Sequence, residues 1–224
     1  MKIALINGSP KTKASASKSL LDDLKHYFPE QTQITEFAFH TPELSSDTIQ
    51  KLYKADAWIF SFPLYVDGIP GQLLSCLVHL EETIRQGKTA QPENKAAETD
   101  LKKQIRIYGI VNCGFYEGIQ AEYALQILQN WCNKTGYLWG GGIGVGSGGG
   151  LAQMPKTKSG HGPREPIDHA LSLLAETLLT SDTTKNSYVS VAFPRFLYKM
   201  AAQFGWRQLI RANGGKAKNL GKKL

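Results

Sequence analysis

Cysteine is scarce in this chain of 224 residues, which contains only Cys76, Cys113 and Cys132 and no C-x-x-C pair. A sparse, odd number of cysteines argues against a disulfide-stabilised fold and against a cysteine-ligated metal site, and it fits a reducing compartment. No stretch approaches the ~20 apolar residues of a membrane-spanning helix. The apolar run at residues 3–6 is too short for the core of a secretory signal. We therefore expect a cytoplasmic protein, and we assign no metal ligand.

Acidic residues are missing from the C-terminal end of the sequence. Residues 185–224 contain nine Lys or Arg and no Asp or Glu, whereas the other 184 residues carry 17 basic and 19 acidic groups. The formal charge of +7 therefore belongs to this tail, and the rest of the chain has a balance of −2. An anionic partner should accordingly be sought at the tail.

The length and the spacing of apolar residues predict one α/β domain followed by an extension. A single domain of this class commonly has ~200–250 residues. Strands are predicted at 2–7, 33–39, 57–62, 104–111 and 137–145, and helices at 17–27, 45–54, 70–85, 117–135 and 164–179. This alternation is typical of a five-stranded parallel sheet with helices on both faces. We place the domain at residues 1–182 and a basic C-terminal extension at residues 183–224, and we expect Leu73, Leu74, Leu77 and Leu80 on one side of their helix.

The predicted topology separates loops that can bind a ligand from loops that cannot. In such sheets the ligand lies beyond the carboxyl ends of the strands. This edge receives a first loop (residues 7–17), a second loop (63–69), a third loop (112–117) and a fourth, glycine-rich loop (146–163). The polar segment 87–103 falls at the opposite edge, where we expect an exposed insertion without a role in chemistry.

The first loop is unusually rich in hydroxyl groups and cations. Its sequence runs Gly8-Ser9-Pro10-Lys11-Thr12-Lys13-Ala14-Ser15-Ala16-Ser17 and leads into a predicted helix. A helix N-terminus offers free N–H groups and partial positive charge, so the loop favours a phosphate. The alternative is a solvated turn in which Ser17 is the N-cap. The loop is not a Walker A motif, because GxxxxGK[ST] is absent.

The second and third loops combine small residues with aromatic ones. Pro63 and Pro70 frame a stiff segment that can hold Tyr65 against a flat ligand, although Tyr65 also fits an ordinary surface position. The third loop reads Asn112-Cys113-Gly114-Phe115-Tyr116-Glu117. One phosphate loop and two aromatic loops together indicate a phosphorylated, planar, aromatic ligand.

On these motifs the chain resembles the NAD(P)H-dependent FMN reductase-like flavoproteins of the flavodoxin fold. The matching elements are Gly8-Ser9-Pro10-Lys11 with Ser15-Ala16-Ser17, the P-x-Y-x-x-x-x-P pattern of Pro63, Tyr65 and Pro70, and residues 112–116. The resemblance spans about residues 1–180 in element order. It departs at Ala16, where a polar residue is usual, which removes one phosphate or ribityl contact. The compact cysteine motif of the related iron–sulfur flavoproteins is absent, which excludes a cluster.

The resemblance implies FMN as cofactor, NAD(P)H as co-substrate and three groups of binding residues. The phosphate would be bound by the first loop, at Ser9, Lys11, Ser15, Ala16 and Ser17. The ring and the ribityl chain would be flanked by the second loop, at Pro63, Leu64, Tyr65, Val66 and Gly68. The edge of the ring would contact the third loop, at Asn112, Gly114, Phe115 and Tyr116. The implied enzyme passes electrons from the nicotinamide through FMN to a small acceptor such as a quinone, an azo or nitro compound, a flavin or a metal. We name no catalytic acid or base, since the flavin supplies the redox chemistry. The alternatives are a flavodoxin-like electron carrier and, through the tail, a nucleic-acid binder, which we disfavour.

Three further signals do not indicate sites. Residues 144–149 satisfy GxGxxG, but no helix is predicted to begin there, so we attribute the glycines to close backbone approach. Cys113 at a strand end fits a small filler residue, and His161 fits a solvated loop position as well as a substrate contact.

The sequence of the tail predicts a basic helix in which large apolar residues are interleaved with cations. Arg195, Lys199, Arg207 and Arg211 are interleaved with Phe196, Met200, Phe204, Trp206 and Leu209. Such a helix fits a membrane surface or an acidic partner. We prefer packing of its aromatic side on the domain or on a second copy, and we expect a homodimer with the flavin sites near the interface.

Overall fold

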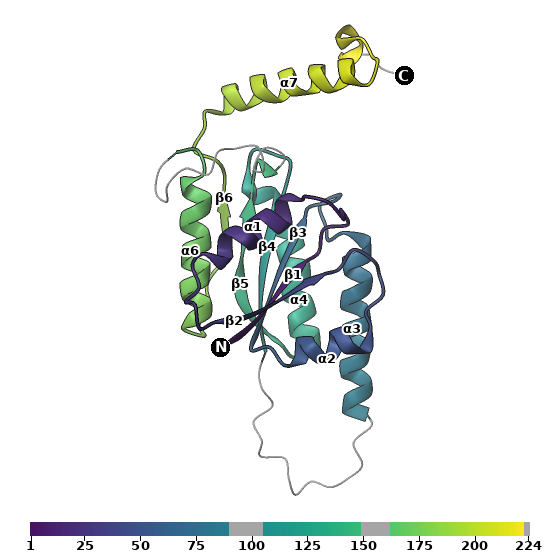
Figure 1. Cartoon of the computed structure of the whole chain (residues 1–224), viewed down its shortest axis with the longest axis vertical. Coiled ribbons are helices and arrows are strands. Elements are labelled where there is room, and N and C mark those ends of the chain that lie inside the picture. The colour runs from purple at the N-terminus through teal and green to yellow at the C-terminus, as the bar shows by residue number, and fades with distance from the viewer. Residues whose placement is uncertain (90–104, 149–161, 222–224) are drawn as a thin grey trace, which may run out of the picture. The chain divides into compact units, whose positions relative to one another are not determined.

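The computed structural model describes residues 1–89, 105–148 and 162–221, and it divides into two compact units, Met1–Val191 and Ala192–Leu224 (Figure 1). The division lies later in the chain than the boundary at residue 182, because a short strand, β6 (Ser187–Val189), belongs to the sheet of the first unit. His161 and nearly all of the segment 87–103 lie outside the described residues.

The first unit is built on a parallel sheet, as the alternation of elements predicts. Its strands are β1 (Lys2–Asn7), β2 (Gln33–Ala38), β3 (Ala57–Pro63), β4 (Arg106–Asn112), β5 (Leu138–Val145) and β6, in the order β2-β1-β3-β4-β5-β6. The expected strand number of five was one too few. The sequence Ser187-Tyr188-Val189 is too short to show a periodic pattern, and only its pairing with β5 makes it a strand.

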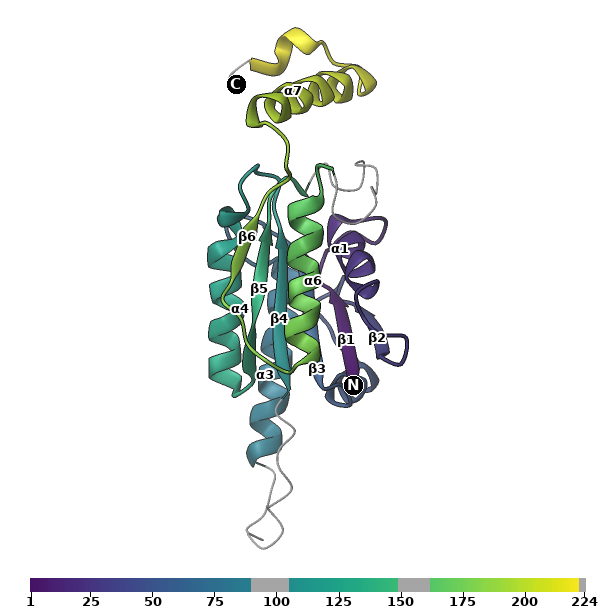
Figure 2. The ribbon, with the colours of Figure 1, turned by 90° about the vertical axis from the view of Figure 1, so that its left-hand side faces the viewer.

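Helices cover both faces of the sheet (Figure 2). They are α1 (Ala16–Lys25), α2 (Ser46–Tyr53), α3 (Gly71–Thr89), α4 (Glu122–Thr135), which follows the 3-10 turn η1 (Gly118–Ala121), and α6 (Glu165–Leu179). The helices α1 and α6 pack on one face, while α2, α3 and α4 share a core on the other. Because side chains alternate along a strand, β3 directs Trp58 and Phe60 into the second core and Ile59 toward α1.

One expectation about α3 was wrong. Leu73, Leu77 and Leu80 are buried as expected, but the side chain of Leu74 is 46% exposed. Successive helical residues are turned by about 100°, so Leu74 leaves the buried row and lines up with Val78 one turn later, which is also exposed.

The order of the strands places a topological switch point beside β1. The chain passes from β1 to β2 at one side, then returns to β3 on the other side of β1. Ligands of open α/β sheets bind at such a switch point, beyond the carboxyl ends of the strands. The loops after β1, β3 and β4 meet at this edge.

The second unit consists of α7 (Arg195–Ala212) and the 3-10 turn η2 (Ala217–Gly221). No residue of α7 is buried. Among the described residues, no helix has both the length and the apolar character that crossing a membrane requires.

Candidate functional site

Strand register brings the first three loops to one edge of the sheet. Asn7, the last residue of β1, pairs with Ser61 of β3, and Pro63 at the end of β3 pairs with Asn112 at the end of β4. The N–H of Leu64 also donates to the carbonyl of Asn112 (2.8 Å), which extends the pairing into the second loop. The candidate binding residues of the three loops therefore lie on neighbouring strand ends.

The beginning of the first loop is fixed by its own polar groups. The Ser9 N–H donates to Asn7 Oδ1 (3.1 Å), and the Lys11 N–H donates to Ser9 Oγ (3.3 Å). Gly8 donates its N–H to the carbonyl of Ser61 (2.8 Å). A Cβ at Gly8 would lie 2.5 Å from Leu73 Cδ2, so only glycine lets the loop approach α3 this closely.

The first loop is also held by two residues outside it, His40 and Gln72, which the sequence analysis did not identify. His40, just after β2, contacts the Ser9 carbonyl through Nδ1 at 2.7 Å, and Nδ1 is the donor because a carbonyl only accepts. Gln72, on the first turn of α3, donates from Nε2 to the carbonyls of Gly8 (3.0 Å) and Phe39 (3.5 Å). Both contacts join segments distant in sequence, and no local motif marks either residue.

The end of the first loop presents a run of free peptide N–H groups. From Thr12 to Ser17, six successive N–H groups have no acceptor among the described residues. The next N–H, of Lys18, donates to Ser15 Oγ (3.2 Å), so Ser15 is the N-cap of α1 and the alternative that assigned the cap to Ser17 is wrong. Successive N–H groups at a helix N-terminus attract an anion, and they suit a phosphate.

The side chains of Ser17 and Asn112 bond to each other. Ser17 Oγ donates to Asn112 Oδ1 (2.7 Å), and Ser61 Oγ donates to the Ser17 carbonyl (3.0 Å). All three residues are buried. This network ties the start of α1 to the ends of β3 and β4, so Ser17 has its N–H, and not its hydroxyl, available to a ligand.

The second loop contains a tight turn with an apolar tip. Tyr65 and Gly68 exchange two backbone hydrogen bonds (3.1 and 3.0 Å) across Val66 and Asp67, which have φ of 48° and 58°. Two such residues define a type I′ turn. A β-branched residue in this region is strained by about 1–2 kcal/mol, and at Val66 the paired hydrogen bonds hold it in place. Val66 is fully exposed and Tyr65 is partly exposed, so both face outward at the ligand edge.

The third loop offers an exposed aromatic residue beside open space. Phe115 is exposed, and a Cβ at Gly114 would meet no atom of the described residues within 4 Å. Tyr116 Oη donates to the Val191 carbonyl (3.4 Å). Cys113 is buried beneath the loop, where burial raises the pKa of its thiol, as expected of a filler residue and not of a reactive thiolate.

The glycines after β5 allow the fourth loop to contact the third. The N–H groups of Ser147 and Gly148 donate to the carbonyls of Phe115 (2.6 Å) and Cys113 (2.7 Å). A Cβ at Gly146 would lie 2.0 Å from the Tyr116 carbonyl oxygen. These contacts explain the glycines at 144–148 by close backbone approach, as the sequence indicated.

A separate hollow of about 370 Å³ lies on the β2 side of the first loop. It is lined by Leu5, Asn7, Thr12, Lys13, Ala14, Lys18, Leu21, Glu36, Phe37, Ala38 and His40. No residue of the second or third loop contributes, so this hollow is not the place where a ring would lie against Tyr65 or Phe115.

The fold has counterparts among solved structures. The chain is similar to the Trp repressor binding protein from Bacillus subtilis (16% identity, 79% of this chain and 97% of that chain, TM-score 0.54). It is also similar to an NADH:FMN oxidoreductase, EMOB, in its apo form (13% identity, 82% and 90%, TM-score 0.53) and to the NAD(P)H:quinone oxidoreductase from Methanothermobacter marburgensis (14% identity, 80% and 96%, TM-score 0.52). At these identities the likeness establishes a flavodoxin-like fold.

The sequence itself supplies the family. No curated protein matches it. The sequence model of the family described as NADPH-dependent FMN reductase matches residues 1–133, more than half of the chain and the part that carries the first, second and third loops. The chain therefore belongs to the NADPH-dependent FMN reductase family.

Proposed function

We propose that this protein is an FMN-dependent NAD(P)H oxidoreductase that reduces a small acceptor. The phosphate of FMN would bind the N–H groups of residues 12–17, with Lys11 and Lys13 adding charge. The ring would lie between the Tyr65–Gly68 turn and the third loop. Bound FMN would accept a hydride from the nicotinamide and deliver the two electrons to a quinone, an azo or nitro compound, a flavin or a metal.

The observation that carries this proposal is the run of N–H groups from Thr12 to Ser17 without an acceptor among the described residues. A hydrogen bond to a charged group contributes about 1.5–3 kcal/mol, and an anion here would also gain from the dipole of α1. Asn7, His40 and Gln72 hold the loop through hydrogen bonds within the protein. The residues present therefore fit the phosphate of FMN.

The chain's own residues position the ring and shield it. Tyr65 and Phe115 are exposed aromatic side chains on adjacent loops, and open space adjoins Gly114. Aromatic and apolar surfaces cover a planar ring and exclude water from it. The turn at Val66 fixes the second loop on one side of the ring, and the hydrogen bonds from the fourth loop fix the third loop on the other side.

Ligand titration tests the phosphate role directly. We expect FMN to bind at least about 100-fold more tightly than riboflavin, which lacks the phosphate, because two or more charged hydrogen bonds are lost. FAD should bind more weakly than FMN. Equal affinity for FMN and riboflavin would contradict the assignment of the first loop.

Reduction of the bound flavin separates an enzyme from a carrier. Anaerobic addition of NADH or NADPH should bleach the visible absorption of the FMN-loaded protein rapidly, and a quinone should restore it over many turnovers. A flavodoxin-like carrier would bleach only with a partner reductase. Bleaching no faster than that of free FMN would refute the oxidoreductase assignment.

We also propose that two copies associate through the outer sides of α3 and α4. Leu74 and Val78 form one exposed apolar row, Tyr123 and Ile127 form another, and the two helices contact each other. A Cβ at Gly68 would lie 3.8 Å from Ile127 Cδ1, so the second loop borders this surface. The homodimer expected from the sequence would then have its flavin sites at the interface without any contribution from the tail.

A charge placed on this surface tests the dimer. Leu74→Arg should give a monomer by light scattering at micromolar concentration, because an unpaired charge is costly in an apolar interface. Leu173→Arg is the matched control, since Leu173 is 48% exposed, against 46% for Leu74, but lies on α6. A wild-type monomer, or the same mass for both variants, would refute this interface.

A further inference from the structure

The second unit exposes large apolar side chains that the first unit's function does not use. Phe196, Met200, Phe204, Trp206 and Leu209 of α7 are all more than half exposed, and no residue of this helix is buried. Soluble surfaces rarely leave so many bulky apolar groups together, and such groups mark an interaction site.

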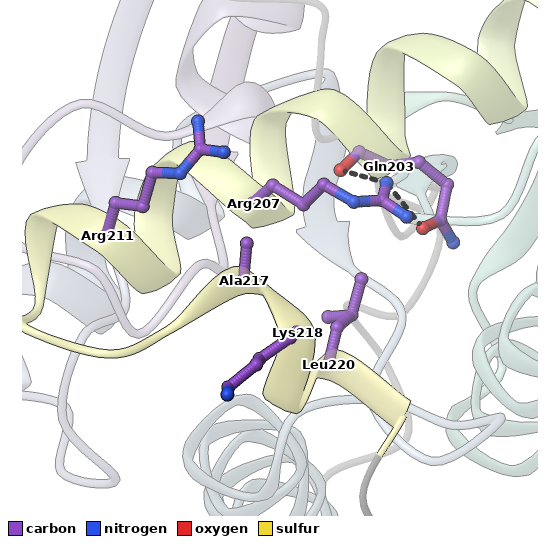
Figure 3. Close-up of a pocket in the computed structure, with 6 residues that line it drawn as sticks. All are labelled: Gln203, Arg207, Arg211, Ala217, Lys218 and Leu220. Atoms are coloured by element: carbon purple, nitrogen blue, oxygen red, sulfur yellow. Dashed lines mark hydrogen bonds between the residues drawn. The ribbon is translucent and has the colours of Figure 1, made fainter.

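The sequence of the same unit contains cations but no acidic residue. No Asp or Glu follows Asp182, while Lys and Arg occur throughout the tail. Between α7 and η2 lies a hollow of about 560 Å³, lined by Gln203, Arg207, Arg211, Ala217, Lys218 and Leu220 (Figure 3). Arg207 extends along α7 to Gln203, donating from Nη1 to the Gln203 carbonyl and to Oε1, both at 3.0 Å. The hollow thus presents three cations to solvent.

Three of the apolar side chains lie on the same side of α7 as the two arginines that line this hollow. Phe196, Met200 and Phe204 recur every four residues, and Arg207 and Arg211 continue the same side of α7 at intervals of three and four. We call these five residues the α7 row. Trp206 and Leu209 fall on the opposite side. One side of the helix is therefore apolar in its first half and cationic in its second.

We propose that the α7 row and the hollow at η2 dock the protein on the surface of a bilayer that contains anionic phospholipid. A helix in the membrane interface buries apolar groups at the headgroup boundary, while its cations attract anionic lipids. The apolar half of the row fits the first requirement, and Arg207, Arg211 and Lys218 fit the second, with the hollow receiving a lipid phosphate.

The two other occupants fit only part of this surface. A second copy of the tail would bring cations against cations, and residues 1–184 carry a net charge of only −2 with which to attract it. A nucleic acid would bind the cations, but it offers nothing that buries the aliphatic side chain of Met200. A bilayer with anionic headgroups satisfies both the apolar and the cationic residues of the α7 row.

Vesicle sedimentation of the full chain tests the proposal. The protein should bind vesicles of phosphatidylcholine mixed with phosphatidylglycerol, and added salt should weaken this binding. Pure phosphatidylcholine should bind at least roughly tenfold more weakly. Equal binding to both vesicles, or no binding to either, would refute the proposal. So would salt-dependent binding to duplex DNA without vesicle binding, or loss of the dimer in the tail variants below.

Matched variants locate the docking side. Arg207→Gln with Arg211→Gln should weaken vesicle binding by roughly 20-fold or more. Lys185→Gln with Lys199→Gln removes the same charge from residues outside the row and the hollow, and it should cost less than about threefold, because attraction to anionic lipid falls off within about one Debye length. Equal losses in the two pairs would overturn the assignment of the row.

A second pair tests the apolar half. Phe204 and Leu209 are 62% and 61% exposed, but only Phe204 belongs to the row. Phe204→Ser should weaken binding by roughly tenfold, and Leu209→Ser by less than about threefold. Unchanged circular dichroism and unfolding midpoint should accompany every variant, since none of these residues is in a core. A larger effect from Leu209→Ser would place the membrane on the other side and contradict the proposal.

Discussion

At the scale of single residues, the site depends on close contacts that leave no room for substitution. Gly8 lies against Leu73 and Phe62 at the point where β1 becomes the first loop. His40 and Gln72 hold the carbonyls on either side of this point. The position of the run of free N–H groups therefore depends on residues that never touch a phosphate.

We expect Gly8→Ala to destabilise the protein by about 1–3 kcal/mol, because its Cβ would overlap Leu73 Cδ2 and displace the loop. FMN affinity should fall as well. Urea unfolding and FMN titration measure both effects. Gly71→Ala is the control: a Cβ there meets no atom of the described part of the chain within 4 Å, and its effect should stay within about 0.5 kcal/mol. Similar stability of the two variants would contradict the packing argument.

At the scale of elements, the N-terminus of α1 carries the proposed contacts to the phosphate of FMN. Ala16 is the first residue of α1, and the N-cap Ser15 has extended φ and ψ of −133° and 151°. Proline is favoured at this first position and tolerates an extended residue before it. A proline at position 16 therefore deletes one N–H group of the run without disturbing the helix.

We expect Ala16→Pro to weaken FMN binding by roughly 10- to 100-fold through the loss of one charged hydrogen bond. Riboflavin affinity and the unfolding midpoint should not change. Ser46→Pro repeats the substitution at the first residue of α2, whose N-cap Ser45 is also extended, and should leave FMN binding intact. If Ala16→Pro binds FMN like the wild type, the phosphate does not use this part of the run.

A second element-scale contact joins the two helices on one face of the sheet. Arg164, at the start of α6, forms a buried ion pair with Asp23 of α1. Arg164→Ala should cost about 3–5 kcal/mol, because it removes the guanidinium group that faces a buried carboxylate. Lys51→Ala removes an exposed pair with Asp47 and should cost at most about 0.5 kcal/mol. Chemical denaturation measures the free energy of unfolding of both variants. Equal losses would show that the buried pair stabilises the protein no more than the exposed pair does.

At the scale of the whole molecule, the buried apolar side chains all belong to the first unit. Every buried apolar side chain of the described residues lies at or before Val191. Residues 187–191 nevertheless belong to the site, since Val189 accepts from the Gly146 N–H (2.8 Å) and Val191 from Tyr116 Oη (3.4 Å). The end of the first unit thus supports the third loop.

Two deletions exploit this division. Removal of residues 192–224 should preserve the unfolding midpoint, FMN binding and the dimer, while abolishing binding to anionic vesicles. Removal of residues 187–224 also deletes β6, and it should lower both stability and FMN affinity because the third and fourth loops lose their support. Thermal unfolding and flavin titration separate the two. If the removal of residues 192–224 abolishes the dimer, the tail contributes to the dimer interface, and the interface proposed at α3 and α4 is wrong.

Local sequence pattern was enough to predict the architecture of the first unit. The alternation of strands and helices predicted a parallel sheet, because the spacing of apolar residues that indicates each element is visible within a short stretch of sequence. The short strand β6, the exposure of Leu74 and the N-cap at Ser15 needed the structure. Each depends on which surface packs against which, and that is decided by contacts between segments far apart in the sequence.

The sequence alone determined that a loop rich in hydroxyl groups and cations precedes a helix, that aromatic loops follow β3 and β4, and that the positive charge belongs to the tail. Tertiary structure decided which groups of these segments remain available. It paired the Ser17 hydroxyl with Asn112 and braced the first loop with His40 and Gln72, leaving six N–H groups unpaired within the described residues. The physical reason is that a motif specifies donors and acceptors, whereas only the folded chain determines which of them the protein itself satisfies.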